Sequence, residues 1–272
     1  MPFKKFEICE NLSEQPFSEL YNTKNGNINL VIKNNKECFL ECDILSSPKP
    51  IINWYKNDKL HQSHLDNILD HTDDYLNSKN MNSQIGWSSI LSKIQIYSNN
   101  VGDQFKCEII SPCINEKIIS DTYTIPEFAL HSCSKNYDNI HFLKNLNKNN
   151  IFSILSYFNP YQSLYIKTPV ITTATTMRME YPGNFITLSC KNEAYPKATN
   201  KWEVIENDNE NGSGISIDNF NYFKVLDNGD IFLNTTQLPN DIVQMALRCN
   251  ASNVYGWDIF VSTILLVTEE RK

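Results

Sequence analysis

Hydrophobic and polar residues alternate along several short segments of this 272-residue chain, and turn residues separate the segments. Residues 89–96 (Ser-Ile-Leu-Ser-Lys-Ile-Gln-Ile) alternate most clearly. A period of two places successive side chains on opposite faces of a strand. Strands at this spacing, with turns between them, favour a β-sandwich over a parallel α/β fold. The first half of the chain contains five further expected strands, at residues 27–32, 38–42, 51–55, 104–107 and 117–125.

The second half of the chain repeats this order of elements. Residues 185–190 read as a strand that leads through Pro196 to a strand around Trp202. Residues 225–233 contain two short apolar runs around Asp-Asn-Gly, which predicts a β-hairpin because Asn-Gly tolerates positive φ. Strands at 247–249 and 259–267 complete the unit.

One arrangement of cysteine and tryptophan occurs in both halves. A cysteine is followed after twelve residues by a tryptophan, and a second cysteine follows the first after 65 residues in one half and 59 in the other. A disulfide between two packed sheets, with a buried tryptophan against it, is the core of an immunoglobulin-type sandwich. The two sets are Cys42, Trp54 and Cys107, and Cys190, Trp202 and Cys249.

The predicted fold is therefore all-β, with two tandem immunoglobulin-like β-sandwiches joined by a long connector. We expect an irregular N-terminal tail over residues 1–23, a first domain over 24–127 and a second domain over 166–270. Residues 128–165 are too long for an ordinary linker. Within them, residues 151–158 are apolar enough to form a packed strand or short helix.

Charge and cysteine content narrow the function. A net charge of −7 argues against nucleic acid and against an anionic membrane surface, since both attract basic patches. Eight cysteines, an even number without a CxxC motif, indicate disulfides in an oxidising compartment rather than a zinc module. We therefore expect a secreted, extracellular protein that is not inserted in a membrane.

Two segments of the second domain resemble a known family. Residues 249–256 (Cys-Asn-Ala-Ser-Asn-Val-Tyr-Gly) look like the Cys-x-Ala-x-Asn-x-x-Gly turn of intermediate-set immunoglobulin domains, and residues 225–230 resemble the hairpin that precedes it. Two such domains and a long connector resemble the secreted two-immunoglobulin-domain group that includes nematode zwei-Ig proteins and an insect insulin-binding ecdysone-induced protein. The resemblance is closer in the second domain, because the first replaces the Asn-x-x-Gly turn with Ser111-Pro112-Cys113.

This resemblance implies an extracellular binding protein that sequesters or presents a ligand, which could be an insulin-like peptide. The alternative it implies is an adhesion or axon-guidance factor that contacts neuronal surface proteins. Association of the chain with itself stays open. Phe105 and Leu247 replace the tyrosine found two residues before the last cysteine of many such domains, so the tyrosine-corner hydrogen bond is absent.

Four cysteines remain after the two core pairs, and strand direction excludes one pairing. The strands that hold Cys42 and Cys107 run in the same direction on opposing sheets of such a sandwich. Cys38 lies four residues before the first and Cys113 six residues after the second. At roughly 3.3 Å per residue these two lie some 30 Å apart, whereas a disulfide needs Cα atoms within about 7 Å.

The remaining positions suggest one set of disulfides. Cys133 follows the last strand of the first domain, which descends towards Cys38. Cys9 precedes the first strand, which starts near Cys113. We therefore expect the pairs Cys9–Cys113 and Cys38–Cys133.

Four Asn-x-Ser/Thr motifs support a secreted, glycosylated chain. Residues 1–7 have no apolar core long enough for a signal peptide, so we expect that a signal was removed or lies upstream. No stretch approaches the roughly 20 apolar residues that span a bilayer. The acceptor asparagines are Asn11, Asn211, Asn234 and Asn250.

Residues 61–74 hold three of the five histidines and four aspartates, which could ligate zinc or calcium. The spacing matches no known site, so a solvated loop is the simpler interpretation. No nucleophile motif accompanies these residues. We expect no enzyme activity, no metal and no cofactor.

The alternation of strand side chains predicts where a ligand binds. Inward Trp54 and Cys107 turn six neighbouring side chains outward, namely Ile51, Asn53, Tyr55, Lys106, Glu108 and Ile110. Of these, Ile51, Tyr55 and Ile110 would make an exposed apolar strip on the first domain. An equal alternative is that the connector or second domain covers this strip. The same construction on the second domain gives a polar face of Lys201, Glu203, Arg248 and Asn250. Tyr255 and Trp257, which flank Gly256, form a second candidate patch, unless Trp257 begins the core of the last strand.

Overall fold

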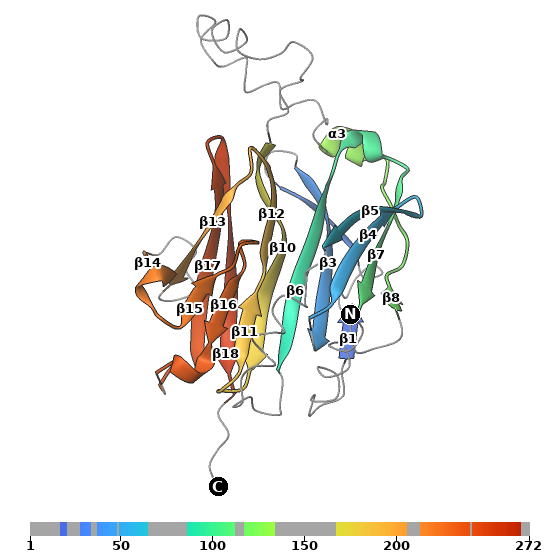
Figure 1. Ribbon diagram of the computed structural model, residues 1–272. Coiled ribbons are helices and arrows are strands. Elements are labelled where there is room, and N and C mark those ends of the chain that lie inside the picture. Colours follow the sequence, from blue (N-terminus) through green and yellow to red (C-terminus); the bar gives the residue numbers. More distant parts are fainter. Residues whose placement is uncertain are drawn as a thin grey trace, which may run out of the picture.

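The structure is a computed structural model of the chain, and its regular elements are almost all β-strands (Figure 1). They form two sandwiches, which confirms the fold class that the sequence predicts. The description covers residues 17–20, 28–33, 37–47, 49–64, 86–111, 117–133, 167–205, 213–239 and 241–267.

The first domain packs two layers around a core of isoleucine side chains. The Cys42–Cys107 disulfide links the layers with a Cα–Cα distance of 6.7 Å, and Trp54 beside it is fully buried and donates from Nε1 to Ser92 Oγ. One layer holds β1 (Phe17–Leu20), β2 (Asn29–Ile32), β3 (Cys38–Ser47) and β6 (Trp87–Ile96). The other is a five-stranded sheet of β4 (Ile51–Lys56), β5 (Lys59–His64), β7 (Gln104–Ile110), β8 (Lys117–Ile119) and β9 (Tyr123–Thr124).

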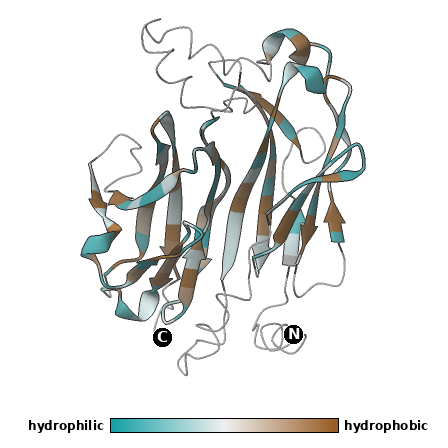
Figure 2. Ribbon diagram, turned by 45° about the horizontal axis from the view of Figure 1, so that its top comes forward, coloured by the Kyte–Doolittle hydropathy of each residue, from teal (hydrophilic) through white to brown (hydrophobic). Residues whose placement is uncertain are grey.

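The second domain repeats this construction. Its Cys190–Cys249 disulfide has a Cα–Cα distance of 6.6 Å, and buried Trp202 accompanies it. A three-stranded sheet of β11 (Phe185–Leu188), β15 (Phe223–Val225) and β16 (Ile231–Asn234) forms one layer. The opposing layer contains β13 (Thr199–Ile205), β14 (Gly214–Ser216), β17 (Gln244–Asn253) and β18 (Gly256–Leu266). The long strand β10 (Lys167–Glu180) pairs first with β12 (Cys190–Tyr195), which follows β11 in the chain, and then with β18. In Figure 2 apolar and polar positions alternate along many of these strands.

The expected hairpin at 225–233 is confirmed. β15 and β16 pair antiparallel, and Gly229 in their turn has φ of +86°. A Cβ at this glycine would meet Asn200 Nδ2 at 2.6 Å, so this position needs a glycine for its conformation and for its space.

One strand joins the two domains into a single sheet. β10 pairs antiparallel with β6 of the first domain over Thr173–Met179, and parallel with β18 over Met177–Glu180. A ten-stranded sheet therefore runs through both domains, as the adjacent strands β6, β10 and β18 of Figure 1 show. No pattern in the sequence predicts this pairing.

Two segments outside the expected first domain belong to it. Residues 17–20, expected in an irregular tail, form β1, which pairs with the end of β3, and Ser18 Oγ lies 2.6 Å from Ser46 Oγ. Four residues are too few for a clear period, whereas the long edge of β3 offers them hydrogen-bond partners. After the last strand of this domain, α3 (Ala129–Ser132) packs on the core with buried Ala129. Residues 151–158 lie outside the described part of the chain.

Cys38 and Cys133 form a disulfide with a Cα–Cα distance of 5.4 Å, the pairing that strand direction suggested. It ties the end of α3 to the start of β3. The expected partners Cys9 and Cys113 lie outside the described residues.

Candidate ligand-binding faces

A network of polar side chains lies at the centre of the outer face of the five-stranded sheet. Glu108 on β7 is 4% exposed, and its carboxylate accepts hydrogen bonds from Asn53 Nδ2 at 2.9 Å and from the Tyr55 hydroxyl at 3.0 Å. Lys117 Nζ lies 3.1 Å from the other carboxylate oxygen. Burial by itself raises the pKa of Glu108, but the hydrogen bonds from Asn53, Lys117 and Tyr55 outweigh it and hold the pKa below its usual value.

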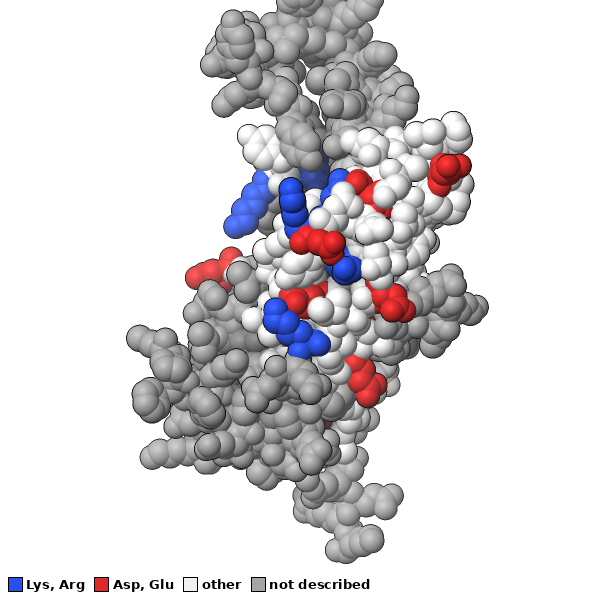
Figure 3. Space-filling view, turned by 90° about the vertical axis from the view of Figure 1, so that its right-hand side faces the viewer, with Lys and Arg blue, Asp and Glu red and all other residues white. Residues whose placement is uncertain are grey.

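This face is therefore more polar than the apolar strip that the sequence predicts, and its role in ligand binding stays a prediction. Ile51 and Ile110 are cross-strand partners and only partly exposed, and the Tyr55 hydroxyl is engaged by Glu108, a hydrogen bond that raises the pKa of the phenol. Alternation correctly turned these side chains outward, together with Asn53 and Glu108, but it could not show that the last two are buried. Figure 3 views the side of Figure 1 on which this sheet lies, and Lys and Asp/Glu side chains are interspersed over its described part.

The outward face of the ten-stranded sheet is more apolar. In β6, Ile90 and Ile94 point into the core of the first domain, so Leu91 and Trp87 lie on the other face. Trp87 pairs with Met179 of β10, and Met179 pairs with Leu265 of β18. An apolar row thus crosses from one domain to the other.

The strand β18 continues this row along the second domain. Val261 and Ile259 are cross-strand partners of Arg248 and Asn250, whose neighbours in β17 point into the core. Trp257, two residues further, is 66% exposed. We call this surface the shared face; its apolar members, all partly or well exposed, are Trp87, Leu91, Met177, Met179, Trp257, Ile259, Val261 and Leu265.

The hairpin tip predicted as a second patch lies at one end of the shared face. Trp257 is exposed and does not begin the core, whereas Tyr255 is partly exposed. Asn253 Oδ1 accepts from the backbone N–H groups of Tyr255 and Gly256, which fixes the turn. Val254 between them is 84% exposed.

Polar residues border the shared face. Arg248 Nε donates to Glu203 at 2.9 Å, so these two predicted outward residues form an ion pair, and Lys201 beside them is exposed. On the first domain, the side chain of Lys93 in β6 is buried, at 6% exposed. Its ammonium group lies 5.1 Å from the centre of the Phe39 ring and 4.0 Å from the carboxylate of Asp258 in β18. Burial lowers the pKa of Lys93, and the nearby Asp258 carboxylate opposes this effect.

A cavity of about 280 Å³ lies between the domains, lined by Gln62 and Ser63 of β5 and by residues of β12. Its polar groups already bind one another: Gln62 donates to Glu193, and Lys167 forms an ion pair with the same carboxylate. We therefore assign this cavity to the joint between the domains and not to a ligand.

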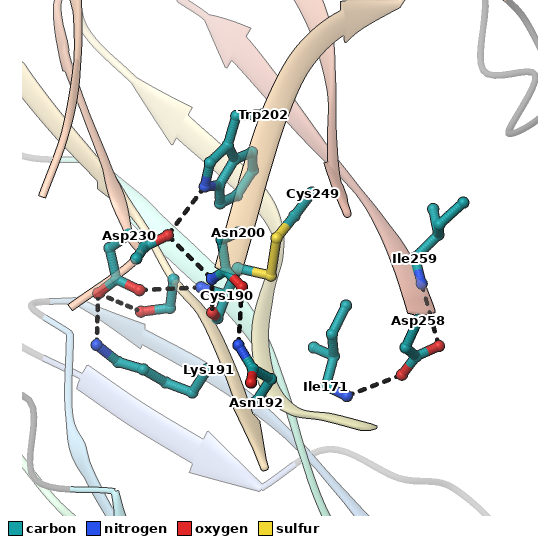
Figure 4. The surroundings of a disulfide bond; sticks show 12 residues. Ile171, Cys190, Lys191, Asn192, Asn200, Trp202, Asp230, Cys249, Asp258 and Ile259 are labelled. Carbon is teal, nitrogen blue, oxygen red and sulfur yellow. Dashed lines mark hydrogen bonds and ion pairs between the residues drawn. A yellow bond between two sulfur atoms is a disulfide. The ribbon is translucent and has the colours of Figure 1, made fainter. Parts of the chain in front are cut away.

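The core disulfide of the second domain lies within a polar network (Figure 4). The carboxylate of Asp230 is fully buried and accepts from the Cys190 backbone N–H at 3.0 Å and from Lys191 Nζ at 2.9 Å. Trp202 Nε1 donates to the Gly229 carbonyl at 3.0 Å. Because these groups bond one another around the core disulfide, we assign them to the stability of the fold and not to ligand binding.

The His/Asp segment lies mostly outside the described residues. His61, which lies in the described part, makes an edge contact with Phe105, with 6.2 Å between the ring centres. Burial lowers the pKa of His61, and the positive charge of nearby Lys56 lowers it further. No group of three or more His, Cys, Asp or Glu side chains that could hold a metal occurs among the described residues.

Two of the four predicted glycosylation sites lie in the described part of the chain. Asn234 is the last residue of β16, and Asn250 lies within β17, whereas Asn11 and Asn211 lie outside the described residues. No helix in the described part is long and apolar enough to cross a membrane.

The fold and its two core disulfides define a tandem immunoglobulin-domain protein. The chain is similar to the crystal structure of neural ectodermal development factor IMP-L2, with a TM-score of 0.51 and 17% identity over 93% of this chain and 95% of that chain. It also matches the N-terminal Ig1-2 module of the Drosophila receptor protein tyrosine phosphatase DLAR (TM-score 0.32, 15% identity, 92% and 99% covered) and Sidekick-1 immunoglobulin domains 1-5 (0.32, 12%, 94% and 40%). At 17% identity the likeness to the IMP-L2 structure shows the fold alone. No protein-family model matches the chain, and no curated protein matches its sequence.

Proposed function

We propose that the protein is a secreted immunoglobulin-superfamily binding protein that sequesters or presents an extracellular peptide or protein ligand. The shared face carries this proposal, because it places eight apolar side chains in adjoining positions on β6, β10 and β18. Clusters of exposed apolar side chains mark interaction sites when polar residues border them, as Arg248 and Glu203 do here. The disulfides support an oxidising compartment.

The first ligand to test is an insulin-like peptide. The resemblance to secreted two-immunoglobulin-domain proteins suggests this class. A small folded peptide with an apolar surface suits a face that is built on paired strands, because little of it has to be ordered on binding. An adhesion or axon-guidance role would use the same face for a neuronal surface protein or for a second copy of the chain.

Affinity capture from the organism's own extracellular fluid, followed by mass spectrometry, tests this function. We expect recovery of a small disulfide-rich peptide that forms a stoichiometric complex with the purified protein. Recovery of membrane receptors, or concentration-dependent dimers without any ligand, would favour the adhesion role instead.

A further inference from the structure

The outward face of the three-stranded sheet carries an aromatic pair beside a glycosylation motif. Ile186 and Leu233 of β11 and β16 point into the core with no exposed surface, so their neighbours Phe185 and Phe232 point outward. The two rings have 5.1 Å between their centres and an interplanar angle of 37°. Both are partly exposed.

Asn234 lies at the edge of this ring pair. It is the cross-strand partner of Phe185, and it follows Phe232 by two residues on the same face. Its chain segment is firmly held, because the Asn234 backbone N–H donates to the Tyr222 carbonyl at 2.9 Å and the Thr235 hydroxyl donates to Asn184 at 2.6 Å.

The Asn234 side chain also has a fixed orientation. Its Oδ1 accepts from the backbone N–H of Thr236 at 3.0 Å and from the Thr236 hydroxyl at 2.6 Å. Among the described residues, none accepts a hydrogen bond from its Nδ2, the atom to which an N-linked sugar attaches. The amide nitrogen is thus available while the carbonyl oxygen is held in place.

We propose that Asn234 carries an N-linked glycan whose first N-acetylglucosamine packs its C–H face on the Phe185–Phe232 ring pair. The negative face of an aromatic ring attracts polarised C–H groups, and the sugar would cover apolar ring surface that is now exposed to water. The glycan then covers the outward face of the three-stranded sheet and leaves the shared face to the ligand. The proposal rests on secretion, the compartment of the proposed function, because N-glycosylation occurs in the secretory pathway.

Asn250 provides an internal comparison. It lies within β17 between Lys201 and Ile259, its Oδ1 is buried without a hydrogen-bond partner in the described structure, and a glycan there would project over the shared face. We therefore expect higher glycan occupancy at Asn234 than at Asn250.

The test uses the full chain secreted from eukaryotic cells. Glycopeptide mass spectrometry should find Asn234 occupied. Trimming with an endoglycosidase that leaves one N-acetylglucosamine should preserve the Tm, whereas complete removal should lower it by about 4 °C. In the variant carrying Phe185→Leu and Phe232→Leu, which keeps an apolar face but removes the rings, the two treatments should give equal Tm values.

Three outcomes separate the possible failures. Occupancy at Asn250 with none at Asn234, or a Tm loss that persists in the leucine variant, overturns this inference and leaves the proposed function standing. A chain that is retained inside the cell and carries no glycan contradicts secretion, and the proposed function falls with it.

Discussion

The backbone N–H of Gly86 in the first domain donates a hydrogen bond of 2.7 Å to the carboxylate of Glu180 in the second. Glu180 is fully buried, accepts further hydrogen bonds from Tyr181 and Asn184, and forms an ion pair with Arg178, which in turn donates to Ser88. These contacts lie where β6 and β10 pair. They fix the two domains in one orientation and so create the shared face.

Gly86→Ala should disrupt this joint. A Cβ at residue 86 would lie 1.7 Å from the Met179 carbonyl oxygen, so backbone must move. We expect a loss of about 3 kcal/mol in the free energy of unfolding, measured by urea denaturation. The exposed substitution Lys59→Ala is the control and should change stability by less than about 0.5 kcal/mol. A Gly86→Ala protein as stable as this control would show that the domains do not pack in this way.

Removing either partner of the buried ion pair should cost more than removing both. Glu180→Gln leaves the Arg178 charge buried without a counter-ion, and Arg178→Gln does the reverse, so each should destabilise by about 3 kcal/mol. The double variant should lose clearly less than the sum of the two, because neither buried charge remains. Additive losses in a double-mutant cycle would mean that the two side chains do not interact.

The Glu108 network predicts a pH dependence. The folded-state pKa of this carboxyl lies below its unfolded value, so its ionisation stabilises the fold above the unfolded pKa, and this contribution is lost as the pH falls through the folded pKa. Glu108→Gln should therefore cost about 1–3 kcal/mol at pH 7 and progressively less in acid. Urea denaturation from pH 7 to pH 3, with exposed Glu127→Gln as the control, measures this. A difference that does not change with pH would refute the assignment.

The disulfides can be checked chemically. Non-reducing peptide mapping should find Cys38 linked to Cys133, and we predict that Cys9 is linked to Cys113. A Cys38→Ser/Cys133→Ser variant should lose about 2–5 kcal/mol of stability, since α3 is no longer tied to β3. Peptides that link Cys9 to Cys38 would disprove both pairs at once.

Local patterns predicted each sandwich well, because the disulfide, the tryptophan and the two-residue period act within one domain. The hairpin turn of Asp227, Asn228 and Gly229 is an example, since Gly229 supplies the positive φ that the turn needs. The pairing of β6 with β10 joins residues 81 to 92 positions apart, Ser88 with Arg178 for instance, and no local pattern encodes it. The sequence holds one sign of this pairing, Gly86, which comes just before the clear strand at 89–96. A glycine at such a position can mark a site where another segment of backbone approaches closely.

The same limit applies to the outward face of the five-stranded sheet. Period-two alternation correctly turned Tyr55 and Ile110 outward, but it treats each outward residue as exposed. Glu108 lies among them and is buried, because Asn53, Tyr55 and Lys117 surround its carboxylate. Of the shared face, only Trp257 was predicted as part of a patch, because the face as a whole forms only when β6, β10 and β18 pair.

Binding calorimetry with an insulin-like peptide of the same organism tests the central claim that the ligand occupies the shared face. Met177→Glu and Val261→Glu place a charge on this face in β10 and β18, and each should weaken binding by about 30-fold or more while the Tm shows that the protein is folded. Lys224→Glu, on the outward side of the three-stranded sheet, is the control and should bind like the unmodified protein. Unchanged affinity in both shared-face variants, with binding lost instead in Tyr55→Ala, would contradict the account.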